Sequence, residues 1–176
     1  RYDGISYQAY KYIIDDSTSL SSSLVQSSYI DSKNRLWFGT ENGLNLYDRE
    51  NDRFKRIPND AFTVDADETI SISSIKEDAE GNLFLGILDL GLFKMNLDDF
   101  SVERVLSNES LESISLNASE IAINESGKVY VATDRGIKQY DYKTNTLRPA
   151  VFNGNEGDFH INNPTESLLI DASNTI

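Results

Sequence analysis

The chain has 176 residues and a formal net charge of −13, with 16 Lys and Arg against 29 Asp and Glu. Such acidity would repel a polyphosphate, so we do not expect a nucleic-acid-binding protein. The absence of Cys and the single His exclude disulfides, thiolate metal sites and multi-His metal sites. Hydrophobic residues make up 39%, enough for a packed core, and no apolar run approaches the roughly 20 residues of a membrane-spanning helix.

Residues 1–23 are predicted to hold the end of one structural unit and the loop that leads to the next. The Tyr-Asp pair at positions 2–3 matches the pair at 47–48, which closes a predicted strand. An outer strand is therefore expected at about Ser6–Tyr12, followed by a polar connection.

Residues 24–70 contain the pattern on which the rest of the chain is built. Asp31–Asn34 offers turn chemistry, and Asn34 can adopt the left-handed conformation. Asn42-Gly43 predicts a tight hairpin turn of type I′, which needs a positive φ twice. Apolar runs between these turns predict strands at 24–30, 36–40, 44–47 and 54–57.

The same pattern occurs twice more, so that Leu36 corresponds to Leu83 and Val129, at offsets of 47 and 46 residues. In the second unit, residues 71–117, strands are expected at 71–77, 83–87, 92–96 and 102–106. In the third unit, residues 118–165, they are expected at 118–124, 129–133, 137–140 and 147–152.

Two kinds of residue recur at equivalent positions in these units. A large ring side chain occupies the second strand, and a glycine stands two residues later or in the tight turn that follows. The ring side chains are Trp37, Phe84 and Tyr130, and the glycines are Gly39, Gly86, Gly43, Gly91 and Gly136. We expect each ring to fill the wedge between neighbouring sheets, and the glycine on the same face to leave room for the neighbour.

A period near 46 residues made of short strands is typical of a β-propeller. The fold class predicted is therefore all-β, with consecutive four-stranded antiparallel blades. Residues 166–176 match the start of a further blade, so we expect the chain to be a fragment of a larger propeller. Because partial blades leave open sheet edges, self-association of the fragment, as a homodimer or otherwise, is also expected.

The stretch 24–48, with its Trp-Phe-Gly-Thr and Asn-Gly-Leu segments, closely resembles the two-component regulator propeller repeat. The entry at 2–7 and the Ser-Leu-Ser at 19–21 resemble it as well. This resemblance implies a seven-bladed propeller in the sensor region of a Bacteroidetes-type hybrid two-component system. It implies a periplasmic location, a membrane anchor and a histidine kinase elsewhere in the protein, and detection of glycan-derived oligosaccharides that control polysaccharide-utilisation genes.

Candidate ligand-binding residues lie where the tight turns and the blade-crossing loops share one face of a propeller. Sugar recognition combines aromatic faces with planar polar side chains. The candidates are Asn42, Arg135, Phe159 and His160, with Glu41 and Asp134 beside them. No cofactor is expected.

Two alternatives keep the same fold. The first is a protein-interaction propeller without a small ligand. The second is a polysaccharide-processing enzyme, in which Glu41, Asp89 or Asp134 would supply a carboxylate pair. No nucleophile motif or phosphate-binding loop supports catalysis, and the fragment is predicted not to be an enzyme. Asp65, Asp67 and Glu68 only faintly match a calcium loop, because its glycine and distal Glu are missing.

Overall fold

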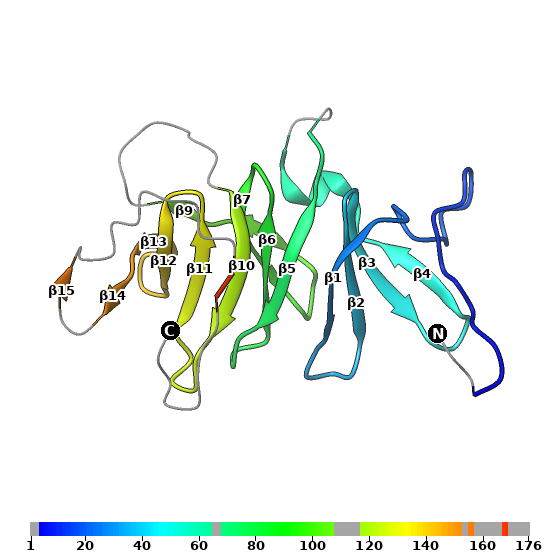
Figure 1. The fold of residues 1–176 in the computed structure, drawn as a ribbon, viewed down its shortest axis with the longest axis horizontal. Helices are drawn as coiled ribbons and strands as arrows, with labels where there is room; N and C mark the ends of the chain where they lie inside the picture. Colours follow the sequence, from blue (N-terminus) through cyan, green and yellow to red (C-terminus); the bar gives the residue numbers. More distant parts are fainter. Residues whose placement is uncertain (1–3, 65–67, 108–116, 153–154, 157–166, 169–176) are drawn as a thin grey trace.

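Three sheets, each with four antiparallel strands, stand side by side in the order of the sequence, as the computed structural model shows (Figure 1); a fifth strand joins the third sheet. The structure describes residues 4–64, 68–107, 117–152, 155–156 and 167–168. The first sheet contains β1 (Val25–Ile30), β2 (Leu36–Thr40), β3 (Gly43–Asp48) and β4 (Arg53–Arg56). The second contains β5 (Ile72–Glu77), β6 (Asn82–Ile87), β7 (Gly91–Asn96) and β8 (Val102–Arg104). The third contains β10 (Ala118–Ile123), β11 (Val129–Thr133), β12 (Gly136–Asp141) and β13 (Thr146–Pro149).

The four strands named for each sheet form an antiparallel meander, in which they follow one another without a crossover. The first strands of the sheets, β1, β5 and β10, are neighbours, and the chain crosses from one sheet to the next after β4 and β8 (Figure 1). This is the arrangement of consecutive propeller blades, so the predicted fold class is confirmed.

The turn between the first and second strands of each sheet is built as expected. Asn34, Gly81 and Gly127 all have positive φ, at 60°, 81° and 77°. In each turn the backbone N–H of that residue donates to the carbonyl of Asp31, Asp78 or Asn124. The same hairpin is therefore closed three times in the same way. The first residue of the turn accepts backbone hydrogen bonds through its side chain, and the last adopts the left-handed conformation.

The tight turn between the second and third strands differs from the type I′ prediction. Gly43 has a φ of 105°, but Asn42 is not among the residues with positive φ. Thr40 sets this turn instead, because its hydroxyl accepts from the Asn42 N–H and donates to the Gly43 carbonyl. Thr133 makes the same two bonds with Arg135 and Gly136. In a turn that the threonine hydroxyl holds in this way, only the glycine needs a positive φ.

Side chains of successive residues on the second strand of each sheet point to opposite faces of that sheet. Trp37, on β2, packs in one apolar cluster with Leu83, Leu85 and Phe93 of the second sheet. Phe84, on β6, packs in the next cluster with Val129 and other residues of the third sheet. Trp37 and Phe84 are fully buried and Tyr130 is 6% exposed. In the first two sheets, the recurring ring side chain is therefore directed toward the following sheet.

The recurring glycine lies where the next sheet comes closest. A Cβ on Gly39 would stand 2.7 Å from the Cβ of Ile72, at the start of β5. A Cβ on Gly86 would stand 3.0 Å from the carbonyl oxygen of Ala118, at the start of β10. The predicted role of these two glycines is confirmed, because a side chain there would push the neighbouring inner strand away.

Several elements differ from the sequence prediction. The expected strand at Ser6–Tyr12 is not formed, and Tyr10 instead packs edge-on against Tyr47 and Phe54 of the first sheet. The 3-10 helix η1 (Asn59–Phe62) inserts the buried Phe62 under the loop after β4. The strand expected at 147–152 splits into β13 and β14 (Val151–Phe152), and β14 pairs with β15 (Asn155–Glu156). The chain after β8 forms β9 (Leu106–Ser107), which pairs in parallel with β13.

Candidate functional site

Four of the six predicted ligand residues lie in the tight turns of the first and third sheets. Glu41 and Asn42 connect β2 to β3, and Asp134 and Arg135 connect β11 to β12; all four are exposed. The Glu41 N–H donates to the Leu24 carbonyl, 3.1 Å away, which ties this turn to the loop entering β1. The tight turns and the incoming loops therefore share one face, as expected.

A hollow of about 660 Å³ lies on this face beside the first sheet, and we call it the turn hollow. It is lined by six hydroxyl-bearing residues together with Leu24, the Asn42 amide and the Glu41 carboxylate; the hydroxyl-bearing residues are Tyr12, Ser21, Ser22, Ser23, Thr69 and Ser71. The structure thus brings two predicted residues together in a concave, polar and nearly neutral environment.

The other predicted residues do not join this hollow. Asp134 and Arg135 lie in the third sheet, where the Asn117 N–H donates to the Asp134 carboxylate at 3.1 Å. Phe159 and His160 fall outside the described residues, as do Asp65 and Asp67 of the weak calcium motif. Among the residues that the structure describes, no group of three or more His, Cys, Asp or Glu side chains could hold a metal ion.

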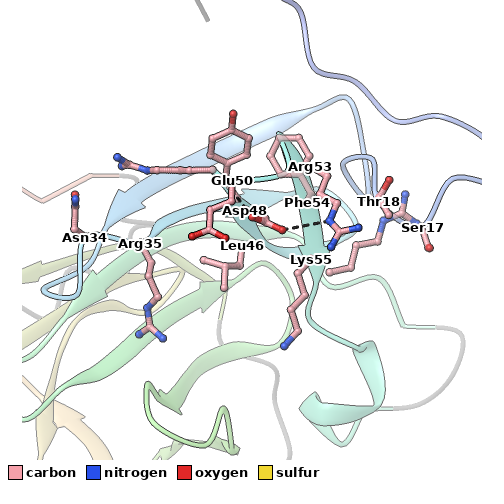
Figure 2. Close-up of a pocket in the computed structure, with 13 residues that line it drawn as sticks. Ser17, Thr18, Asn34, Arg35, Leu46, Asp48, Glu50, Arg53, Phe54 and Lys55 are labelled. Carbon is pink, nitrogen blue, oxygen red and sulfur yellow. Dashed lines mark hydrogen bonds and ion pairs between the residues drawn. The ribbon is translucent and has the colours of Figure 1, made fainter.

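A second hollow, of about 740 Å³, lies over the outer strands of the first sheet (Figure 2), and we call it the basic hollow. Its floor is formed by Leu46, Asp48, Arg53 and Lys55, which share one face of β3 and β4. The remaining lining residues stand around this floor: Ser17, Thr18, Asn34, Arg35, Tyr47, Arg49, Glu50, Phe54 and Arg56. Five basic and two acidic side chains line it, in a chain whose net charge is −13.

Two of these five cations are held by the fold. Arg56 donates from Nη2 and Nε to carbonyl oxygens of Asp16, Ser19 and Leu20, so it clamps the loop before β1. Arg35 reaches the second sheet, where its Nη1 donates to the Leu97 carbonyl at 3.2 Å. These two guanidinium groups have structural roles that explain their presence.

The other three cations are exposed. Arg53 pairs with Asp48 through Nε at 3.2 Å, and its side chain remains 54% exposed. The Lys55 ammonium lies 5.2 Å from the ring centroid of Phe100. Arg49 is exposed in the turn after β3. Figure 2 shows Arg35 and Lys55 extending in the same direction on either side of Leu46.

Asp31 anchors the cation at the rim of the basic hollow. Its buried carboxylate accepts from the Arg35 Nε at 2.6 Å, from the Arg35 backbone N–H at 2.8 Å and from the Trp37 Nε1 at 2.8 Å. Burial raises the pKa of Asp31, but the hydrogen bonds from Trp37 and Arg35 outweigh it, so the pKa lies below its ordinary value. One carboxylate therefore orients both the recurring ring and Arg35.

This arrangement predicts a pH-dependent loss of stability. Because the folded-state pKa of Asp31 is lowered, its contribution is present above the unfolded-state value near 3.9 and disappears as pH falls through the folded-state pKa. We expect Asp31→Asn to lower the free energy of unfolding by about 1–3 kcal/mol at pH 7. Urea unfolding at pH 7 and pH 3 measures this, and the loss should be smaller at pH 3. An equal loss at both pH values would contradict the role of the charge.

The sequence contains a signal for the basic hollow in a run of basic residues that covers the turn after β3 and the strand β4. The run from Asp48 to Arg56 carries four of its five Lys and Arg residues. Single cations recur, since Arg148 stands where the first sheet has Lys55, but the cluster as a whole is found in the first sheet alone.

Comparisons with known proteins agree with the fold. Residues 19–42, which span the loop before β1, the strands β1 and β2 and the first tight turn, match the family model described as "Two component regulator propeller". A comparison with curated proteins found no match. Within the described residues, the helical structure offers no segment of the length and apolarity needed to cross a membrane.

Two solved structures of the extracellular domain of BT4673 from B. thetaiotaomicron are similar to this chain; one is described as a one component system and the other as a hybrid two component system. They superpose with TM-scores of 0.69 and 0.71 at 20% identity, covering 88% and 89% of this chain. The extracellular domain of the hybrid two component system BT3049 from the same organism gives 0.62 at 20% identity, over 79% of this chain. The chain spans about a fifth of the length of these structures, 18–20%.

An enzyme also shares the fold. Virginiamycin B lyase from Staphylococcus aureus gives a TM-score of 0.52 at 13% identity, over 70% of this chain and 40% of the lyase. The fold alone therefore does not distinguish sensor from enzyme. Residues 19–42 thus match the two component regulator propeller model, and the described chain shares its propeller fold with the extracellular domains of BT4673 and BT3049.

Proposed function

We propose that this chain is part of an extracytoplasmic sensor domain that binds a glycan-derived oligosaccharide in the turn hollow. The observation that carries the proposal is the lining of that hollow. Six hydroxyl-bearing side chains, one amide, one carboxylate and the Tyr12 ring surround about 660 Å³. Hydroxyl and amide groups both donate and accept hydrogen bonds, which suits the many hydroxyls of a saccharide.

Hydrogen bonds within the fold hold the rim of the turn hollow in place, which supports the proposal. The Asn42 backbone is fixed by the Thr40 hydroxyl, and the Ser21 hydroxyl lies 2.9 Å from that of Thr40. The Asn45 side chain accepts from the Ser21 N–H at 2.9 Å and is itself fully buried. Because these contacts position the rim of the hollow before any ligand arrives, little ordering is needed on binding.

The proposal assigns binding rather than catalysis to this fragment. Glycoside hydrolysis ordinarily needs two carboxyl groups flanking the scissile bond. Of the residues lining the turn hollow, Glu41 alone has a carboxylate. The two-component proteins that share this fold support a sensor in a larger protein, with an anchor in the membrane and kinase activity in other parts of the chain. Control of polysaccharide-utilisation genes is the corresponding output.

Calorimetric titration with a panel of neutral plant and host oligosaccharides tests this function. Loss of a polar contact to a bound sugar should weaken binding by roughly 0.5–1.5 kcal/mol, so we expect Asn42→Ala to raise the Kd by about three- to tenfold. Arg135→Ala, at the equivalent turn position of the third sheet, is the matched control and should leave the Kd unchanged. Equal effects of the two substitutions would place the ligand elsewhere and contradict the proposal.

A further inference from the structure

We propose that the basic hollow binds the sulfate or carboxylate group of an anionic glycan. The local charge is the first reason. Five basic and two acidic side chains line this hollow, and of the basic ones Arg35 is paired with the buried Asp31, while the whole chain carries a net charge of −13. An anion approaching this protein is therefore repelled over most of the described surface and attracted at this hollow.

The blade scaffold does not require these cations. The register of the strand pairs aligns Lys55 with Glu103 in the second sheet and with Arg148 in the third. The same register places Ser101 and Thr146 where the first sheet has Arg53. Since the second sheet forms the same meander with a neutral and an acidic residue at these positions, folding does not account for the cluster in the first sheet.

Arg53, one of the exposed cations, has N–H groups available to donate hydrogen bonds to a ligand. The Arg53 Nε contacts Asp48, and no hydrogen bond from either Nη to a described residue accompanies it. A guanidinium presents a planar fork that matches the two oxygens of a carboxylate or sulfate. The Lys55 ammonium, two residues along the same face of β4, adds a second charge. Together they form a two-point anion site on a rigid strand.

The rest of the lining favours an anionic saccharide over a bare ion. A volume of about 740 Å³ is in the range of pockets that hold small organic ligands. Ser17, Thr18 and Asn34 surround the floor with neutral hydrogen-bonding groups, and Leu46 supplies an apolar surface. These residues suit the hydroxyls and the carbon face of a sugar ring, while the cations suit its acidic substituent.

Titration with two acidic probes tests this inference, which rests on the proposed glycan-sensing function. The probes are a chondroitin sulfate disaccharide and trigalacturonic acid, and a neutral trisaccharide serves as the reference. We expect at least one acidic probe to bind, with a Kd that rises as salt is increased from 20 to about 150 mM, where charges are screened beyond roughly 8 Å. Binding of the sulfated probe alone, or of the uronate alone, identifies which acidic group the site takes.

The decisive variant is Arg53→Ala/Lys55→Ala, which removes two exposed cations from the floor of the hollow. We expect it to raise the Kd of the acidic probe about tenfold. The matched control, Arg104→Ala/Arg148→Ala, removes the same charge from exposed positions on β8 and β13 and should change the Kd less than twofold. Circular dichroism and urea unfolding of both variants verify that each remains folded.

The outcomes separate this inference from the proposed function. If neutral oligosaccharides bind in the turn hollow and neither acidic probe binds, the anion site is wrong and the sensor function stands. Equal effects of the two double variants, or equally tight binding of a hexaglutamate peptide, would also overturn the glycan-specific anion site. If no saccharide of either kind binds, both proposals fail.

Discussion

Replacing Trp37 with Ala should lower the free energy of unfolding by about 3–5 kcal/mol, the range for large aromatic residues removed from a packed core. The indole is fully buried, packs edge-on against Phe100 at 5.8 Å and donates to the Asp31 carboxylate at 2.8 Å. The substitution therefore opens a cavity between two sheets and removes one donor from a buried carboxylate. Urea unfolding followed by circular dichroism measures the loss.

Two further variants separate packing from hydrogen bonding. Trp37→Phe keeps a ring but loses the donor to Asp31, so we expect a loss between wild type and Trp37→Ala. Phe38→Ala is the matched control, because Phe38 is the next residue on β2, faces away from the second sheet and is only half-buried. Its loss should be about 1–2 kcal/mol, at the lower end of the range for point substitutions. If Trp37→Ala cost no more than Phe38→Ala, the packing between sheets would not be the main source of stability.

Gly39→Ala should be more disruptive than Gly86→Ala, the equivalent substitution in the second sheet. An added Cβ would lie 2.2 Å from the Ser27 Oγ and 2.7 Å from the Cβ and Cγ2 of Ile72. The Ile72 atoms belong to the inner strand of the second sheet and cannot swing away, so the two sheets must separate. We expect a loss of about 2–3 kcal/mol, toward the upper end of overpacking.

The other glycines provide a graded control for this experiment. Gly86→Ala meets the Ala118 carbonyl oxygen and the Ser73 Oγ at 3.0 Å, a tight contact that a small shift relieves, so its cost should be about 1 kcal/mol. Gly81→Asn places a side chain in open space at a φ of 81°, which Asn tolerates, and should cost less than about 1 kcal/mol. A reversed order, with Gly81→Asn worse than Gly39→Ala, would contradict the close approach of the sheets.

Features that repeat in the sequence could be predicted, because every copy meets the same physical requirement. Asn34, Gly81 and Gly127 close the same turn with positive φ, and Trp37 and Phe84 face the following sheet. Fold class and strand positions followed from this recurrence. The type of the tight turn did not, since the Thr40 hydroxyl competes with the Asn-Gly signal and satisfies the turn differently.

Features found in one copy could not be predicted from the repeat. Phe100 has a φ of 61°, at the position where the other sheets have Asp52 and Asn145 with φ of 52° and 55°. A bulky residue is strained there, and its ring contacts with Trp37, Arg35 and Lys55 offset that strain. The parallel pair of β9 and β13 likewise depends on the path of a loop rather than on local propensity.

The same distinction, between features that repeat and features found in one sheet alone, applies to the two candidate sites. Glu41 and Asn42 were found because the repeat identifies the turn that carries them, and the turn hollow lies beside that turn. The basic hollow was missed because it belongs to the first sheet alone. Its cations come from two turns and one strand, and only the folded register shows that they surround one space.

Nuclear Overhauser contacts of the ring side chains test the central claim most directly. The chain has a single Trp, so the Trp37 indole resonances are assigned without ambiguity. Successive packing of the sheets predicts contacts from Trp37 to the Phe100 ring, at 5.8 Å between centroids, and from Phe84 to the Tyr140 ring, at 4.9 Å. Contacts of Trp37 confined to residues 24–57, with none to the second sheet, would contradict the account.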